Sequence, residues 1–201
     1  MVRSLPKPVL ILTIVALIAI NVLVWRAGPP AGGARRALTV SVFETGTARG
    51  VHRAVLAITP SGKTLLIDAN SDASILRALG NALPFWHRSL DVVIPLKAGA
   101  GMTEVKNRYH ITKIVPSLTR GARLNFHDGT FVDVLWPPVA NTDAPVLRIS
   151  YGTTSFLIEP IVSARIEKYL ASVGSSLPPP SFIISSSTPA GVFVSNGVAI
   201  H

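Results

Sequence analysis

The distribution of apolar residues along the chain predicts a domain that is rich in β-strands. Short runs of alternating or continuous apolar residues, bounded by Gly, Pro, Asn, Asp or Ser, are typical of strands. Such runs cover residues 38–43, 52–59, 64–68, 91–94, 111–115, 121–126, 130–135, 146–150, 154–158, 182–184, 192–194 and 198–200. Many strands and few helices, in mixed order, indicate an α/β sandwich with its helices outside the sheets.

Two segments of the same domain have the apolar spacing of a helix. In residues 72–83 the apolar positions Ile75, Leu79 and Leu83 recur every four residues, which places them on one helical face. Residues 161–173 carry a second repeat of this kind. Both segments are therefore predicted to be amphipathic helices that pack against a sheet.

Three segments between the predicted strands lack a periodic pattern of apolar residues and are predicted to be turns or loops. Residues 60–63, PSGK, and 127–129, HDG, have the composition of hairpin turns. Residues 95–104, PLKAGAGMTE, follow the apolar strand 91–94 and are predicted to be a loop. Because α/β folds place chemistry in the loops that follow buried strands, residues 95–104 are the first candidate for a functional site.

The longest apolar run lies near the N-terminus and predicts a transmembrane helix. Residues 9–25, VLILTIVALIAINVLVW, are flanked by Lys7 and Arg26. At about 1.5 Å per residue this run spans roughly 26 Å, close to the thickness of a hydrocarbon core. A cleaved secretory signal, cut within residues 31–34, is the alternative. The apolar run is longer than the usual core of such a signal, which favours an uncleaved anchor.

The chain therefore divides into a tail, an anchor, a linker and one folded domain. These parts cover residues 1–8, 9–25, 26–37 and 38–201, and the linker is rich in Gly, Pro and Ala. The predicted location is the cell membrane, crossed once. Cations lie on both sides of the span, so their count does not decide its orientation. The absence of cysteine excludes disulfides and thiolate metal sites.

Side chains that could bind a metal or act in catalysis are scattered along the chain. The histidines are His52, His87, His110, His127 and His201. No two of them are spaced by two or four residues, which argues against a histidine metal site. The serines of 185–187 lack the G-x-S-x-G frame of a serine hydrolase. Histidine and serine chemistry are therefore both disfavoured.

Positive charge is the remaining feature of the sequence that could carry a function. The chain carries a formal net charge of +9, and cations outnumber acids between residues 87 and 127. The candidate anion-binding residues of this stretch are Lys97, Lys106, Arg108, Lys113, Arg120 and Arg123. Two interpretations stay open: a solvated face, or a surface that binds nucleic acid, anionic lipid or a cell-wall polymer.

Five motifs occur in an order and at a spacing that resemble a known family. They are LTVSVFETG (38–46), TPSGKTLLIDAN (59–70), LPFWHRSLDVVI (83–94), VLWPP (134–138) and RISYGTTSFLI (148–158). Together they resemble the metallo-β-lactamase-fold C-terminal domain of ComEC-type competence proteins, which are DNA-uptake channels. The resemblance implies an αββα sandwich with a shortened second half, in agreement with the pattern of predicted strands.

The same resemblance implies that the family's metal site has been lost. In the family, the segment after the strand that matches 91–94 carries H-x-H-x-D-H, which holds metal ions that activate water. The positions that match the ligands hold Lys97, Gly99, Gly101, Met102 and Ile161. Glu159 lies two positions from the last of these, and the family's final histidine has no counterpart in residues 185–188. No metal cofactor is expected.

The apolar run 9–25 and the resemblance together indicate a membrane-anchored protein without catalytic activity, with its domain outside the cytoplasm. Its expected partners are DNA or another polyanion and a membrane protein, in an accessory role in DNA uptake. Lys97 could supply part of the charge that a metal would otherwise offer to a phosphate. The alternatives are an active metal-dependent hydrolase with unorthodox ligands, which needs at least three convergent side chains, and a structural envelope protein.

Overall fold

The computed structural model describes residues 37–47, 50–67, 74–95, 100–116, 118–136, 145–159, 168, 172, 179–185 and 188–201. The predicted tail and anchor, and the linker except for residue 37, lie outside these ranges. Within the described ranges, no helix has the length and apolar character needed to traverse a lipid bilayer.

The first sheet contains six strands, in the order β11-β1-β2-β3-β4-β5. Their bounds are β1 Leu38–Thr47, β2 Gly50–Ile58, β3 Thr64–Ile67, β4 Ser89–Ile94, β5 His110–Ile114 and β11 Gly191–Ser195. Strands β3, β4 and β5 run parallel, whereas the pairs β11-β1, β1-β2 and β2-β3 are antiparallel. The four residues of β3 are all buried, because this central strand is covered on both faces.

The second sheet contains five strands, in the order β10-β9-β8-β7-β6. Their bounds are β6 Arg123–Asn125, β7 Thr130–Trp136, β8 Val146–Tyr151, β9 Thr154–Glu159 and β10 Phe182–Ser185. Strands β9 and β10 run parallel and the other neighbours antiparallel. In β7 the buried residues Thr130, Val132 and Val134 alternate with half-buried ones, which is the period of a strand with one face in a core.

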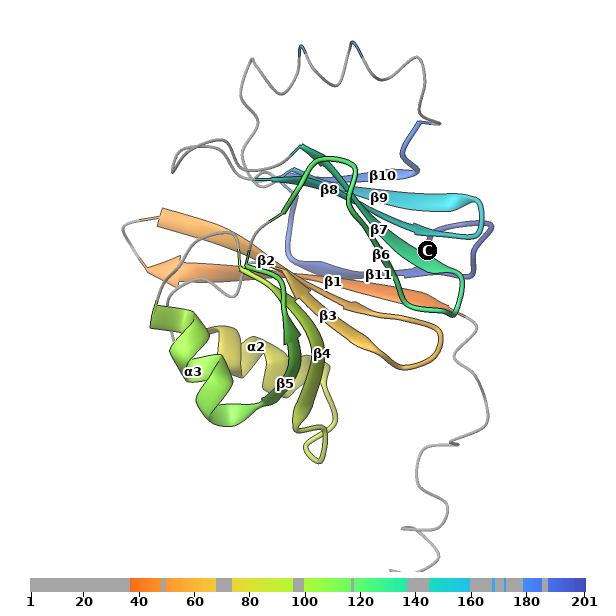
Figure 1. Cartoon of the computed structure of the whole chain (residues 1–201). Coiled ribbons are helices and arrows are strands. Elements are labelled where there is room, and N and C mark those ends of the chain that lie inside the picture. Colours follow the sequence, from red (N-terminus) through yellow and green to blue (C-terminus); the bar gives the residue numbers. More distant parts are fainter. Residues whose placement is uncertain are drawn as a thin grey trace, which may run out of the picture. The chain divides into compact units, whose positions relative to one another are not determined.

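The core lies between the two sheets, and a second apolar layer lies under two helices (Figure 1). Val55, Ile67, Phe156 and Ile158 are among the residues that fill the space between the sheets. Helices α2 (Ser74–Ala82) and α3 (Ala100–Arg108) cover the other face of the first sheet. The described residues thus form a helix, sheet, sheet arrangement, which agrees with three of the four layers of the predicted αββα sandwich.

The hairpin turns predicted at 60–63 and 127–129 are confirmed, and Asp128 links them. Its carboxylate accepts hydrogen bonds from the amide and the hydroxyl of Ser61, at 3.1 and 2.6 Å, and from the Thr130 amide. Burial raises the pKa of Asp128, but the hydrogen bonds from Ser61, Thr59 and Thr130 outweigh it and lower the pKa to about 2. Asp128 therefore ties the two sheets together at one end.

Two predictions for single elements are wrong. The loop predicted over 95–104 gives way to helix α3 at residue 100, because Met102, Val105 and Tyr109 pack their side chains into the layer beneath the first sheet. The strand predicted over 198–200 is only a bridge between Ser195 and Ile200. A turn around Gly197, which has a φ of +89°, replaces the strand.

The helix predicted over 161–173 lies outside the described residues, except for Lys168 and Ser172. Both of these residues are helical.

Candidate functional site

The strands of the two sheets end together on one side of the sandwich. Asp128 joins the hairpin before β3 to the hairpin before β7, and Thr130 of β7 pairs with Tyr151, which pairs with Thr154 at the start of β9. Strands β3 and β9 therefore start at the same end and finish at the opposite one, which we call the carboxyl edge. Parallel strands commonly build their ligand sites at such an edge.

Few groups that could hold a metal lie at the carboxyl edge. Among the residues that the structure describes, no three His, Cys, Asp or Glu side chains come together. Glu159, at the end of β9, is buried and lies beside Ser185 of the parallel strand β10. Among the described residues of this edge, one carboxylate is too little for a zinc or manganese site, which needs three or more protein ligands.

The positions that match the family's metal ligands do not fit a metal either. Met102 lies in α3 with 9% of its surface exposed and packs in the apolar layer beside residues such as Ile75 and Leu79. Gly101 belongs to the same helix and has no side chain that could coordinate an ion. Positions 97, 99 and 161 lie outside the described residues, and Lys, Gly and Ile are not zinc ligands.

Three of the predicted anion-binding cations lie on adjacent elements of the fold. Lys106 and Arg108 are exposed in the last turn of α3, and Lys113 is exposed on β5, the strand that directly follows this helix. The two ion pairs found among the described residues involve none of the three. We call Lys106, Arg108 and Lys113 the basic surface.

Two further residues of the predicted anion-binding set, Arg120 and Arg123, lie near the edge of the other sheet. Arg120 is exposed in the turn that leads into β6. Arg123 of β6 donates from Nε and Nη2 to the two carboxylate oxygens of Asp133, at 2.6 and 3.1 Å, and its guanidinium lies 5.2 Å from the ring centre of Phe131. The hydrogen bond with Asp133 raises the pKa of Arg123. Arg123 is thus engaged within its own sheet.

Lys113 also has a plain structural explanation. Strand β5 is the last strand of its sheet, so part of its backbone hydrogen-bonding capacity faces outward. Charged side chains, above all lysine, protect such strands from pairing with other chains. The position of Lys113 therefore fits both an anion-binding surface and a protected edge.

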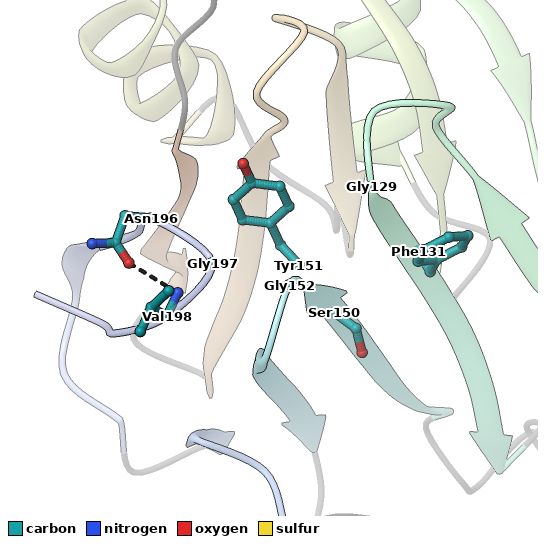
Figure 2. A pocket seen from close by; sticks show the side chains of 8 residues that line it. All are labelled: Gly129, Phe131, Ser150, Tyr151, Gly152, Asn196, Gly197 and Val198. Carbon is teal, nitrogen blue, oxygen red and sulfur yellow. Dashed lines mark hydrogen bonds between the residues drawn. The ribbon is translucent and has the colours of Figure 1, made fainter.

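A hollow of about 400 Å³ lies at the end opposite to the carboxyl edge. Figure 2 shows Tyr151 between the turns that carry Gly129 and Gly197, with Phe131 on the neighbouring strand. The hydrogen bond drawn there runs from the Val198 amide to Asn196 Oδ1, at 2.9 Å. The lining of the hollow contains no histidine, cysteine or carboxylate. The hydroxyls of Ser150 and Tyr151 therefore have no histidine or carboxylate among the lining residues that could activate them as nucleophiles.

The sequence patterns also missed two exposed aromatic residues of the domain. Phe85 and Trp86, in the loop between α2 and β4, are 80% and 56% exposed. They lie inside the motif LPFWHRSLDVVI, so the resemblance drew attention to the motif as a whole and not to these two side chains. Exposure of this kind depends on which segments cover a loop, and a local pattern does not reveal it.

Comparison with known proteins agrees with the fold. No known family profile and no curated protein matches the sequence. A solved Cronobacter sakazakii metallo-β-lactamase with a HARLDQ motif is 15% identical, with a TM-score of 0.51 over 72% of this chain and 70% of its own. BJP-1, a subclass B3 metallo-β-lactamase of Bradyrhizobium japonicum, is 12% identical, with a TM-score of 0.47 over 72% and 74%. The first similarity supports a metallo-β-lactamase-like fold and says nothing about activity.

Proposed function

We propose that this protein is a non-catalytic metallo-β-lactamase-fold protein that is held at the membrane and binds a polyanion. Residues 9–25 form the single-pass anchor, and the domain lies outside the cytoplasm. The observation that carries the loss of catalysis is Met102, a core residue at a position where the related family has a metal ligand. A relationship to the ComEC-type competence domain, and hence an accessory role in DNA uptake beside a membrane protein, is part of this proposal.

Replacement of the ligands and loss of the metal are physically consistent with each other. Histidine or aspartate left in an apolar setting without its metal would cost several kcal/mol, because a buried polar group would lose its partners. Methionine at position 102 avoids this cost by packing with the apolar layer of α2 and α3. This reasoning favours a non-catalytic protein over a hydrolase with unorthodox ligands.

We predict that the full chain, purified in a non-ionic detergent, carries far less than one equivalent of zinc or manganese. Elemental analysis measures the metal content, and hydrolysis of phosphodiester and β-lactam substrates should stay at the background rate. A chelator should leave the unfolding midpoint unchanged, because no metal holds the fold together. Metal near one equivalent per chain, with loss of stability on chelation, would show that the alternative hydrolase is correct.

The proposed polyanion is DNA, bound through the basic surface. The cations of Lys106, Arg108 and Lys113 are exposed and lie on adjacent elements, and we propose that phosphates of one DNA molecule contact all three. Binding that relies on lysine and arginine releases condensed counterions and does not depend on base sequence. The affinity should therefore be weak and should fall steeply with salt.

We predict a log–log salt slope of about −3 for duplex DNA, at roughly 0.9 per neutralised phosphate. Fluorescence anisotropy of a labelled oligonucleotide, titrated with the full chain in detergent, measures it. Lys106→Gln, Arg108→Gln and Lys113→Gln should each flatten the slope by about one unit. Arg77→Gln, on the exposed side of α2, is the matched control and should leave the slope almost unchanged. If the triple variant binds like the wild type, the basic surface is a solvated face, and a structural envelope role gains support.

A further inference from the structure

The loop between α2 and β4 presents two aromatic rings to solvent. Phe85 is 80% and Trp86 is 56% exposed, and their rings meet edge to face with centroids 4.7 Å apart. The His87 amide closes the loop by donating to the carbonyl of Pro84, at 2.8 Å. A single exposed aromatic is common, but an adjacent pair at the end of a loop indicates a surface that something covers. We call Phe85 and Trp86 the aromatic tip.

Cations lie at the base of the aromatic tip. Arg88 is exposed directly after the loop, and its carbonyl accepts a hydrogen bond from the amide of His110, at 2.8 Å, which brings it beside the end of α3. Burial raises the pKa of Tyr109, and the charges of Arg108 and Arg88 act in the opposite direction. Apolar rings above cations are complementary to an anionic lipid surface.

The one carboxylate of the following strand faces away from this charge. Asp91 Oδ2 accepts hydrogen bonds from the amide and the hydroxyl of Thr64, at 2.8 and 3.0 Å. Its charge is thereby used to hold the start of β3 against β4, and it does not neutralise Arg88 by an ion pair.

The aromatic tip lies at the end of the first sheet where the folded domain begins. Thr39 of β1 pairs with Ile58, Ile58 pairs with Thr64, and Thr64 is hydrogen-bonded to Asp91 near the start of β4. Three strand spacings of about 4.8 Å, roughly 14 Å in all, separate β1 from β4. The chain that arrives from the linker therefore enters the domain on the same side as the loop that carries the tip.

We propose that the aromatic tip inserts into the interface of the membrane that holds the N-terminal anchor, with Arg88 on an anionic lipid headgroup. This inference rests on the anchor of the proposed function. The linker, residues 26–37, is rich in Gly, Pro and Ala, and an unstructured chain of twelve residues spans roughly 20 Å on average, which would keep the domain within reach of the bilayer surface. Tryptophan and phenylalanine beside cations are the side chains that bind at this interface.

The three tryptophans of the chain allow a direct test in the full-length protein. The double variant Trp25→Phe, Trp136→Phe keeps only Trp86, and Trp25→Phe, Trp86→Phe keeps only Trp136 as a matched control. Trp136 ends β7 and so lies at the carboxyl edge, opposite to the tip. Each variant is placed in nanodiscs of phosphatidylcholine and phosphatidylglycerol, with and without brominated acyl chains, and the quenching of its fluorescence by bromolipid and by iodide is measured.

We expect bromolipid to quench Trp86 at least about threefold more than Trp136, and iodide to reach Trp86 poorly. Arg88→Gln should shift the ratio of docked to free domains about fivefold towards the free form. If Trp136→Phe impairs folding, the single variant Trp25→Phe keeps both probes, and part of its emission should still be quenched by bromolipid.

The remaining outcomes separate the tip from the anchor. A Trp86 that iodide quenches freely and bromolipid does not overturns the inference, even if the chain stays in the nanodiscs. A Trp86 shielded from both quenchers also overturns it, because a protein then covers the tip. A chain that does not stay with the nanodiscs overturns the anchor of the proposed function together with this inference.

Discussion

Gly152→Ala should destabilise the protein by more than about 3 kcal/mol, the sum of a backbone strain and a backbone clash. Gly152 has a φ of +57°, and a Cβ at this position would lie 2.3 Å from the carbonyl oxygen of Gly197. That carbonyl accepts hydrogen bonds from the amide and the hydroxyl of Thr153, at 2.7 and 3.0 Å, so it has no room to withdraw without breaking them. The contact joins the turn after β8 to the C-terminal segment.

Gly62→Ala is the matched control for this substitution. Gly62 has a φ of +84° in the hairpin before β3, and a Cβ there would meet no atom within 4 Å. It should cost only the strain of a left-handed residue, about 1 kcal/mol. Denaturant unfolding of both variants measures the difference. Equal losses of stability would mean that the approach of Gly152 to Gly197 does not constrain the fold.

Met102→His should lower the free energy of unfolding by about 3 kcal/mol and should not create a metal site. The substitution introduces the residue type that the proposed relationship to the ComEC-type domain would place at this position, but here the side chain packs between α2, α3 and the first sheet. A buried imidazole without a partner pays its full desolvation cost. With no three potential ligands together among the described residues, zinc would have too few protein groups to bind.

The pH dependence and a control variant make this prediction specific. Burial in an apolar layer lowers the pKa of an imidazole, so the unfolded chain binds the proton more readily. The deficit of Met102→His should therefore grow as the pH falls below about 6.5, whereas Met102→Leu should cost less than about 1.5 kcal/mol at any pH. Unfolding with and without zinc measures both. Stabilisation of Met102→His by one equivalent of zinc would show that a metal site remains.

The sequence predicts those strands, helices and turns that depend on the residue pattern of a single segment. The continuous apolar run of β3, the alternation in β7 and the repeat of Ile75 and Leu79 in α2 each follow from the period of one segment. The turns at 60–63 and 127–129 follow from their Gly, Pro and Asp residues. The loss of the metal ligands stays a prediction from the resemblance, which rests on glycine and isoleucine side chains that offer no donor atom to a metal.

Other features depend on contacts between segments that are far apart in the chain, and only the folded structure reveals them. Only the packed layer shows that the glycine-rich start of α3 is helical around Met102, and only the register of β6 against β7 gives Arg123 its carboxylate. The exposure of Phe85 and Trp86 is also visible only in the folded domain. The same holds for their position at the end of the first sheet where β1 starts. Local periodicity specifies which face of an element is apolar, but long-range pairing and packing specify what that face meets.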